Sequence, residues 1–311
     1  MRIVFMGSPR FAVPSLEQLL DSGREVAAVY TQPDRPAGRG RGMTASAVKE
    51  EAAGRGLKIM QPESVRTPEA LAELAALKPD VIVVCAFGQI LPQALLDIPP
   101  FQCLNVHFSL LPRHRGASPA AAAILAGDAF SGVTVQLVRK KLDTGPVLAA
   151  AAVPISPLDN TGTLADKLAI IGAHLLEEAL TGWLRGEIAP RVQDEAGASY
   201  FGQVKKEEGE IDWKKPAAEI WRRVRAYYPW PGCFTTWRGK QLKINEAAVM
   251  PGENNLEPGR VIALPGDGGL GIAAGEGILK VLRIQYEGKK AMTADEFIRG
   301  QRDFTSSLLP G

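Results

Sequence analysis

The run Val81–Cys85 (VIVVC) is the feature that most limits how this chain can fold. Uninterrupted apolar residues, mostly β-branched, are typical of a strand that is buried on both faces, and such strands occur at the centre of parallel sheets. Parallel strands need crossover connections, which are usually helices. We therefore expect strands and helices to alternate around this run, as in α/β proteins.

The first residues of the chain match that expectation. Arg2–Met6 is apolar and ends at Gly7-Ser8-Pro9, after which leucines recur at helical spacing up to Gly23, and EVAAVYTQ predicts the next strand. This βαβ order predicts a doubly wound, mostly parallel, Rossmann-like sheet. The turn GSPRFA lacks the G-x-G-x-x-G pattern, so a nicotinamide or flavin dinucleotide is not indicated.

The length of the chain indicates a second domain. The sequence has 311 residues, of which 46% are hydrophobic, and it becomes polar and aperiodic from Pro190 to Gln203. After a helical pattern broken by Pro229 and Pro231, about five short strand-like runs alternate with Gly-rich turns, as in small OB-like barrels. We assign residues 1–189 to the sheet domain, 190–206 to a linker and 207–311 to the OB-like β-barrel domain.

Composition excludes several classes of protein. The net charge of +2 argues against a protein that wraps nucleic acid along its whole surface. Cys85, Cys103 and Cys233 lie far apart, so neither a disulfide framework nor a metal site is indicated. The start MRIVFMG resembles a strand rather than a signal peptide, and no apolar stretch has the length of a membrane span. We expect a cytoplasmic protein.

The segment Cys103–Pro119 carries the strongest signal for chemistry. Cys103–His107 has the pattern of a short strand, so Asn105 and His107, two residues apart, share one face. Buried amide and imidazole groups need partners or a ligand, which suggests a site. The alternative is a polar pair whose hydrogen bonds are satisfied within the protein. Pro112 and Gly116 end the strand pattern and predict an outward loop.

Asp143 is the expected partner of this pair. It follows the apolar run GVTVQLV and precedes a Thr-Gly-Pro turn, so we expect a second strand to end in a carboxylate as the first ends in His107. Amide donor, imidazole and carboxylate together suit acyl transfer. Ser109 has no G-x-S-x-G elbow around it, so direct transfer to an incoming nucleophile is the simpler interpretation. His114 and His174 are expected to be structural or exposed.

Two further segments are candidates for binding. Phe87, Ile90 and Leu91 follow the central strand, where open α/β sheets bind ligands, and they either wall a flat aromatic ligand or pack as an ordinary loop. The prolines and glycines of Thr31–Thr44 predict a loop without regular structure. Its arginines 35, 39 and 41 suit a phosphate backbone, and a solvated surface loop explains them equally well.

Several motifs together resemble the methionyl-tRNA formyltransferase family. They are FMGSPRFAVPSL, TQPDRPAGRGR, NVHFSLLPRHRGASP, LDTGP, YYPWPG and EGKKAM, and they span nearly the whole chain. The pattern N-x-H-x-S-L-L-P, with later G-x-x-P and L-D-T-G, is specific to folate-dependent formyltransferases as a group. The Arg-Gly loop and the barrel narrow the resemblance to the member that modifies tRNA. Phe108 and the basic run Arg139–Lys141 depart from the usual pattern.

The resemblance implies transfer of the formyl group of 10-formyltetrahydrofolate to the α-amine of methionine on initiator tRNA, with no metal and with the protein acting as a monomer. It places catalysis on Asn105, His107 and Asp143. It implies that the loop Asp34–Arg41 closes over the acceptor stem. The implied folate contacts are Ser109, Leu110, Leu111, Pro112, Phe87, Gly88, Ile90 and Leu91. The implied tRNA contacts are Arg35, Arg39, Arg41, Lys205 and Lys206, together with the barrel.

Other functions remain open from the sequence. A formyltransferase acting on a sugar-nucleotide amine, or a hydrolase of formyl-folate, would use the same sheet, although neither needs the Arg-Gly loop plus a basic barrel. A nonenzymatic RNA-binding protein built on the barrel is an alternative of a different class.

Overall fold

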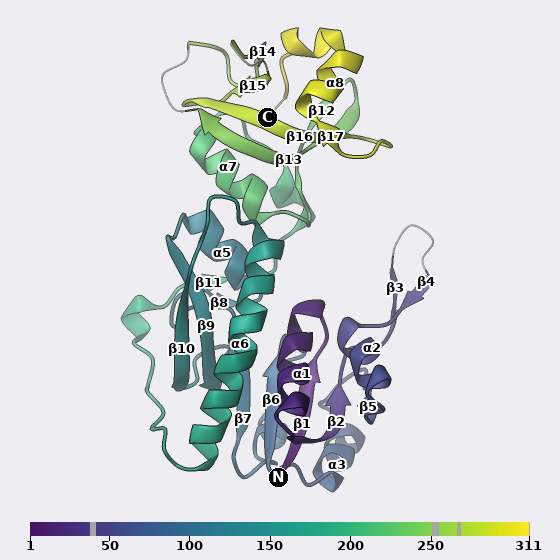
Figure 1. Cartoon of the computed structure of the whole chain (residues 1–311), viewed down its shortest axis with the longest axis vertical. Helices are drawn as coiled ribbons and strands as arrows, with labels where there is room; N and C mark the ends of the chain where they lie inside the picture. Colours follow the sequence, from purple (N-terminus) through teal and green to yellow (C-terminus); the bar gives the residue numbers. More distant parts are fainter. Residues whose placement is uncertain (38–41, 251–254, 266–268, 311) are drawn as a thin grey trace. The chain divides into compact units, whose positions relative to one another are not determined.

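The computed structural model describes residues 1–37, 42–250, 255–265 and 269–310, and the chain divides into two compact units (Figure 1). The first unit comprises Met1–Pro119, Phe130–Pro154 and Ala165–Phe201. The second comprises Ala120–Ala129, Ile155–Leu164 and Gly202–Gly311.

The first unit is built on a seven-stranded sheet of order β10-β9-β7-β6-β1-β2-β5. All pairings from β7 to β5 are parallel, whereas β9 is antiparallel to both β7 and β10. Its strands are β1 (Arg2–Gly7), β2 (Glu25–Tyr30), β5 (Ile59–Met60), β6 (Val81–Cys85), β7 (Cys103–His107), β9 (Phe130–Leu137) and β10 (Val147–Pro154). The predicted doubly wound, mostly parallel sheet is confirmed, and Val81–Cys85 lies near its centre.

Helices cover both faces of this sheet. On one face, α3 and α4 pack against alternate strand residues such as Met6, Ile82 and Cys103. On the other face lies α6, whose Gly172 approaches Val106 and Val133 so closely that a Cβ there would lie 3.1 and 3.2 Å from their methyl carbons. The helices are α1 (Val13–Asp21), α2 (Ala47–Gly54), α3 (Pro68–Ala76), α4 (Gln93–Leu96), α5 (Pro119–Ala126), α6 (Thr161–Leu184), α7 (Ala217–Ala226) and α8 (Ala294–Gly300). The short 3-10 helices are η1 (Arg10–Ala12), η2 (Glu195–Gly197), η3 (Lys206–Gly209) and η4 (Arg302–Ser306).

The Arg-Gly segment differs from the sequence prediction. It contains two short antiparallel strands, β3 (Arg35–Ala37) and β4 (Gly42–Thr44), with Arg35 opposite Thr44. The prediction of a loop without regular structure was therefore wrong. An edge strand tolerates a proline, because a missing N–H on the unpaired side breaks no ladder bond, and Pro36 lies in a ladder of only two strands, opposite Met43.

The segment predicted as a linker begins inside the first unit. Its residues Tyr200–Phe201 form β11, which pairs in parallel with β8 (Arg115–Gly116). The Arg115 N–H donates to the Ser199 carbonyl and the Ala117 N–H to the Phe201 carbonyl. Residues up to Phe201 thus continue the packing of the sheet unit.

The second unit contains a six-stranded antiparallel sheet of order β12-β13-β16-β15-β14, with β17 paired to β16. Within the described residues the two ends of this order are unpaired with each other, as in a partly closed barrel. This confirms the predicted barrel-like second domain. The strands are β12 (Cys233–Trp237), β13 (Lys240–Met250), β14 (Val261–Ala263), β15 (Leu270–Ala273), β16 (Ile278–Tyr286) and β17 (Met292–Thr293).

Four aromatic side chains form the packing centre at one end of this sheet. The Trp237 ring contacts those of Tyr286, Phe297 and Phe304, at centroid distances of 5.6, 5.9 and 4.9 Å. Most of these rings meet edge to face, the arrangement that aromatic quadrupoles favour. The indole N–H of Trp237 donates to Ser307 Oγ at 2.9 Å, so its polar atom is also satisfied.

In the part of the chain that the structure describes, no helix has both the length and the apolar character needed to cross a membrane.

Replacing Trp237 with Ala is expected to lower the free energy of unfolding by about 3–5 kcal/mol, because a buried aromatic anchor leaves a cavity. Leu282→Ala, at a half-exposed position of the same sheet, is the control and should cost less than about 1 kcal/mol. Chemical denaturation of both variants measures the difference. Equal losses would contradict the assignment of this packing centre.

Candidate active site

The polar end of β7 is the starting point of the site. Cys103, Asn105 and His107 point to the face that α3 and α4 cover, but only Cys103 belongs to the apolar cluster beneath those helices. Leu104 and Val106 point to the opposite face and are buried. The predicted shared face of Asn105 and His107 is thus present, at the point where the apolar lining of the sheet ends.

His107 is buried, and both of its ring nitrogens face acceptors. Its Nε2 lies 3.0 Å from the His114 carbonyl oxygen, and its Nδ1 lies 3.6 Å from Asp143 Oδ1. A carbonyl oxygen only accepts, so Nε2 carries a proton in this arrangement. Nδ1 is then the nitrogen that faces the Asp143 carboxylate.

Asp143 reaches the site by a route that the sequence did not indicate. Because β9 runs antiparallel to β7, its last residue, Leu137, lies opposite Leu104 and not opposite His107. The expectation that this strand ends in Asp143 was wrong, because β9 ends at Leu137 and Asp143 lies in the loop that follows. The loop after β9 instead folds back along the sheet. Gly145 permits this, since a Cβ there would collide with the Leu137 carbonyl oxygen, and Asp143 has a φ of 51°.

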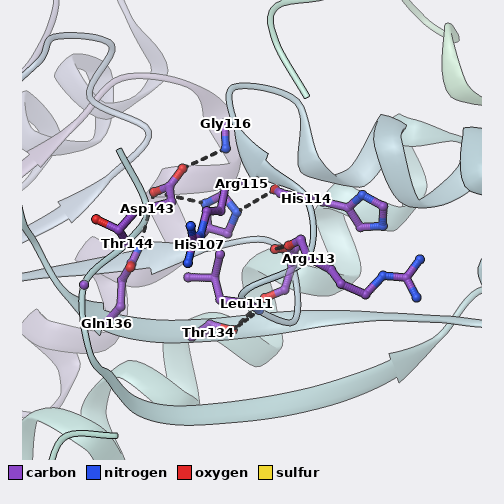
Figure 2. A network of polar contacts seen from close by, with 12 residues as sticks. His107, Leu111, Arg113, His114, Arg115, Gly116, Thr134, Gln136, Asp143 and Thr144 are labelled. Carbon is purple, nitrogen blue, oxygen red and sulfur yellow. Dashed lines mark hydrogen bonds and ion pairs between the residues drawn. The ribbon is translucent and has the colours of Figure 1, made fainter. Parts of the chain in front are cut away.

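Two further donors fix the Asp143 carboxylate (Figure 2). The Gly116 N–H donates to Oδ2 at 2.8 Å, and Gln136 Nε2 donates to Oδ1 at 3.0 Å. The side chain of Asp143 is only 7% exposed. A buried carboxylate needs such donors to offset its desolvation, and these two give one hydrogen bond to each of its oxygens.

The Asn105 amide is the free polar group of the site. Its residue is half-buried, and within the described residues its side chain has no hydrogen-bond partner. Across the ladder Asn105 is paired with Gln136, whose amide holds Asp143. Side chains of directly paired residues lie on the same face, so the free amide lies beside the carboxylate and the imidazole. The structure therefore brings the three predicted residues together.

The predicted folate loop is held from the sheet. Thr134 Oγ1 donates to the Ser109 carbonyl at 2.7 Å and accepts from the Leu111 N–H at 3.1 Å. The Ser109 hydroxyl is buried and donates to the Arg113 carbonyl at 2.6 Å. Ser109 therefore shapes the loop from inside. Leu110, Leu111 and Pro112 are half-buried and form its accessible part.

The second predicted folate segment is tied to the ends of β1 and β2. The Phe87 carbonyl accepts from Ser8 Oγ at 3.2 Å and from Gln32 Nε2 at 3.0 Å. Phe87 and Leu91 are buried in the apolar cluster between the sheet and α3 and α4, so they anchor the segment by packing. Gly88 and Ile90 are exposed, and Ile90 shows 65% of its surface.

The predicted tRNA contacts are only partly described. Arg35 is exposed and pairs with Glu63 at 2.7 Å, whereas Arg39 and Arg41 lie outside the described residues. Lys205 and Lys206 are exposed at the start of η3 in the second unit.

At the base of the Arg-Gly segment, Lys49 and Gln61 hold the Asp34 carboxylate, and these bonds lower its pKa below the usual range. The ion pair with Lys49 and the hydrogen bond from Gln61 therefore fix the start of the Arg-Gly segment.

The two departures from the family pattern have local contacts. The Phe108 ring packs against Phe11 at a centroid distance of 5.3 Å, on the α6 side of the sheet. Arg139 Nη1 donates to Gln102 Oε1 at 2.9 Å, and Lys141 Nζ lies 6.0 Å from the Tyr200 ring centroid. Both basic side chains are thus near protein partners rather than in the site.

Sequence reasoning missed several residues that hold the site. Thr134 and Gln136 were signalled, since they alternate with Val133, Val135 and Leu137 and must share one face of β9. Arg115 and Gln193 carried no such signal. Both are buried, and they lie 78 positions apart while joined by hydrogen bonds.

Within the described ranges, no three His, Cys, Asp or Glu side chains come close enough together to hold a metal ion.

Comparison with known proteins identifies the family. A model described as formyl transferase matches residues 1–180, and one described as the formyl transferase C-terminal domain matches residues 203–302. A protein of Dehalococcoides mccartyi named methionyl-tRNA formyltransferase is 51% identical over 304 residues, covering 98% of this chain and 97% of the relative. The chain belongs to the methionyl-tRNA formyltransferase family. The family and the formyltransferase activity predicted from sequence are confirmed.

Further relatives agree with this assignment. A methionyl-tRNA formyltransferase of Pseudomonas entomophila is 47% identical over 303 residues, with 97% of each chain covered. Among solved structures, an N-formyltransferase from Helicobacter canadensis, in complex with folinic acid and dTDP-3-aminofucose, matches with a TM-score of 0.68 at 20% identity. That match covers 91% of this chain and 98% of the other, and it shows a shared fold.

Gly116→Ala is expected to lower both stability and turnover. Gly116 has a φ of 112°, and a Cβ would collide with the Phe201 carbonyl oxygen, so we expect a loss of about 2–4 kcal/mol. Moving its N–H away from Asp143 should lower kcat by roughly 10- to 100-fold. Denaturant unfolding and steady-state kinetics measure the two effects.

The control is Gly186→Ala, at a glycine with a φ of 71° and no atom near its Cβ position, where only about 1 kcal/mol should be lost. If both variants behaved alike, the close approach of Gly116 to Phe201 would have no role.

Proposed function

We propose that this protein transfers the formyl group of 10-formyltetrahydrofolate to the α-amino group of methionine on initiator methionyl-tRNA, for initiation of translation. The observation that carries the proposal is the convergence of a free amide, an imidazole and a carboxylate at Asn105, His107 and Asp143. The curated relatives at 51% and 47% identity, both named methionyl-tRNA formyltransferase, support the choice of acceptor.

The formyl donor is proposed to lie between the two loops beside the site. The accessible part of Ser109–Pro112 and the exposed residues Gly88 and Ile90 offer apolar surface for a flat ring system. The N-formyltransferase from Helicobacter canadensis, which shares this fold, was solved in complex with a folate derivative, folinic acid. No metal takes part in the proposed reaction.

Asn105 is proposed to stabilise the charge that develops during transfer. As the methionyl amine attacks the formyl carbon, a carbon–nitrogen bond forms and the carbonyl oxygen becomes negative. The side-chain N–H of Asn105, which has no hydrogen-bond partner among the described residues, donates to that oxygen. The His107 ring lies on the same strand face, and the Asp143 carboxylate beside it stabilises positive charge on that ring.

Asp143 and His107 are proposed to move the proton that transfer releases. The attacking amine must lose a proton, and N10 of the leaving folate must gain one as its bond to the formyl carbon breaks. His107 Nδ1 lies 3.6 Å from Asp143 Oδ1, so this pair can take the proton that the amine loses and return one to N10. No protein nucleophile is needed, so no covalent enzyme intermediate forms.

We propose that five basic residues contact the tRNA backbone, and that the barrel of the second unit adds further contacts. The five are Arg35, Arg39, Arg41, Lys205 and Lys206. The monomeric state and the cytoplasmic location stay predictions.

The test of function uses formyl-labelled folate with three acceptors. Label should reach methionine on charged initiator tRNA, and neither a dTDP-amino sugar nor water should compete. Transfer to the sugar would identify a sugar N-formyltransferase, and release of formate would identify a hydrolase. Salt-dependent tRNA binding without any turnover would leave an RNA-binding protein.

His107→Ala should lower kcat by roughly two to four powers of ten while folate affinity is retained, because the ring acts on the reacting atoms rather than on the folate. His174→Ala, an exposed histidine on α6, is the control and should be unchanged. Single-turnover kinetics and folate titration measure the two quantities. Near-normal turnover of His107→Ala would refute this assignment.

Replacing Lys205 and Lys206 together with Ala should weaken tRNA binding. The logarithm of the association constant should also fall less steeply with the logarithm of the salt concentration, by about one unit of slope for each phosphate that is no longer neutralised. Lys58→Ala, an exposed lysine in the first unit, serves as the control. Binding titrations at several salt concentrations give the slopes. An unchanged slope in the double variant would remove both lysines from the interface.

A further inference from the structure

Arg115 is a fully buried charged side chain next to the site. Its guanidinium donates through Nε and Nη2 to Gln193 Oε1, at 3.1 and 2.8 Å. Nη1 donates to Glu195 Oε2 at 3.0 Å and to the Tyr200 hydroxyl at 2.7 Å, and Nη2 donates to Glu195 Oε1 at 2.7 Å. A buried guanidinium is tolerated only when its donors are satisfied in this way. All three partners come from the segment that the sequence suggested was a linker.

The same segment also holds the backbone around Arg115. β8 pairs with β11, and the His114 N–H donates to Ser199 Oγ at 2.9 Å. Residues 114–116 are therefore fixed on two sides, by a side-chain ion pair and by a short ladder. A two-residue ladder alone is weak, so the Arg115 contacts are needed to keep it in register.

Those three residues orient the catalytic pair. The His114 carbonyl accepts from His107 Nε2, and the Gly116 N–H donates to Asp143 Oδ2. Arg115 lies between them in the chain, so its position sets the separation of these two groups. Any shift of Arg115 moves the acceptor of the imidazole and the donor to the carboxylate together.

Gln193 makes a second link to Asp143. Its Nε2 donates to the backbone carbonyls of Asp143 and Gly145, at 2.9 and 2.7 Å, and lies 3.3 Å from Gln136 Oε1. Gln136 in turn donates to the Asp143 carboxylate. Gln193 thus holds the backbone of the folded-back loop directly, and it holds the Asp143 carboxylate indirectly, through Gln136.

We propose that Arg115, Gln193, Glu195 and Tyr200 form a clamp of positioning residues that sets the geometry of His107 and Asp143 for transfer. None of them is placed to touch the reacting atoms. The clamp deepens the proposed function and rests on it.

Glu195 is the clamp residue whose loss should change turnover without unfolding the protein. The Glu195 side chain is 62% exposed, so in a variant that lacks it water can reach the space of the carboxylate and accept the hydrogen bonds of Arg115, which limits the loss in the free energy of unfolding. The pairing is nevertheless bidentate, which restricts the orientation of the guanidinium. The hydrogen bonds from Arg115 lower the pKa of Glu195, so the pair is charged at neutral pH. Loss of Glu195 should therefore loosen the site while the fold stays intact.

The experiment compares Glu195→Ala and Gln193→Ala with Val192→Ala, an 88% exposed neighbour in the same segment. We expect kcat for formylation of methionyl-tRNA to fall roughly 10- to 100-fold in the two clamp variants, with KM for both substrates and the melting temperature of Glu195→Ala unchanged. Glu195→Asp should recover part of the loss. Val192→Ala should match the wild type.

A second comparison tests whether the clamp acts through the catalytic histidine. In a His107→Ala background, adding Glu195→Ala should cause no further fall in kcat, since groups that act as a unit are not additive. Folded clamp variants with wild-type kcat, or an equal further loss in the His107→Ala background, would overturn the clamp. A wild-type protein that cannot formylate methionyl-tRNA would overturn the proposed function itself, and the clamp with it.

Discussion

The contact between His107 and Asp143 is the interaction on which the rest of the site depends. Both side chains are buried, so each needs polar partners that the strand itself does not supply. Those partners are backbone groups of His114 and Gly116 and the amide of Gln136. The loop after β7, the antiparallel strand β9 and the segment up to Phe201 can all be understood as the supports that keep these partners in place.

A mostly parallel sheet is a suitable base for such a site. Apolar residues on one face of β6 and β7 bind α3 and α4, and the polar residues begin where that packing ends. The imidazole and the amide therefore project from a rigid strand, and only the carboxylate depends on a loop. Gly145 permits the close approach of this loop to Leu137, and the hydrogen bonds of Gln193 to the Asp143 and Gly145 carbonyls hold the loop there. Precise placement of this kind is what electrostatic stabilisation of a transition state requires.

Much of this was accessible from the sequence, because the signals were local. The uninterrupted run Val81–Cys85 and the two-residue spacing of Asn105 and His107 each follow from strand periodicity, and the structure has both. The direction of β9 could not be predicted from the sequence, since an apolar strand has the same residue pattern in a parallel or an antiparallel pairing. The short strands around Arg35 were missed because proline and glycine content says little about edge strands.

Contacts between residues that are far apart in the sequence could not be predicted from any local pattern. Arg115 and Gln193 look like ordinary loop residues, and only the fold shows that they meet. The pattern of the segment around Gln193 is polar and aperiodic, as in a linker, because its order comes from partners elsewhere and not from its own periodicity.

The pairing of β11 with β8 has a consequence for how the catalytic unit can be isolated. The two family models stop at residue 180 and resume at 203, so the stretch between them belongs to neither match. A fragment trimmed to the first match would keep Asn105, His107 and Asp143 yet would lack Gln193, Glu195 and Tyr200. The smallest piece that encloses a complete site therefore has its carboxyl end at Phe201 or beyond.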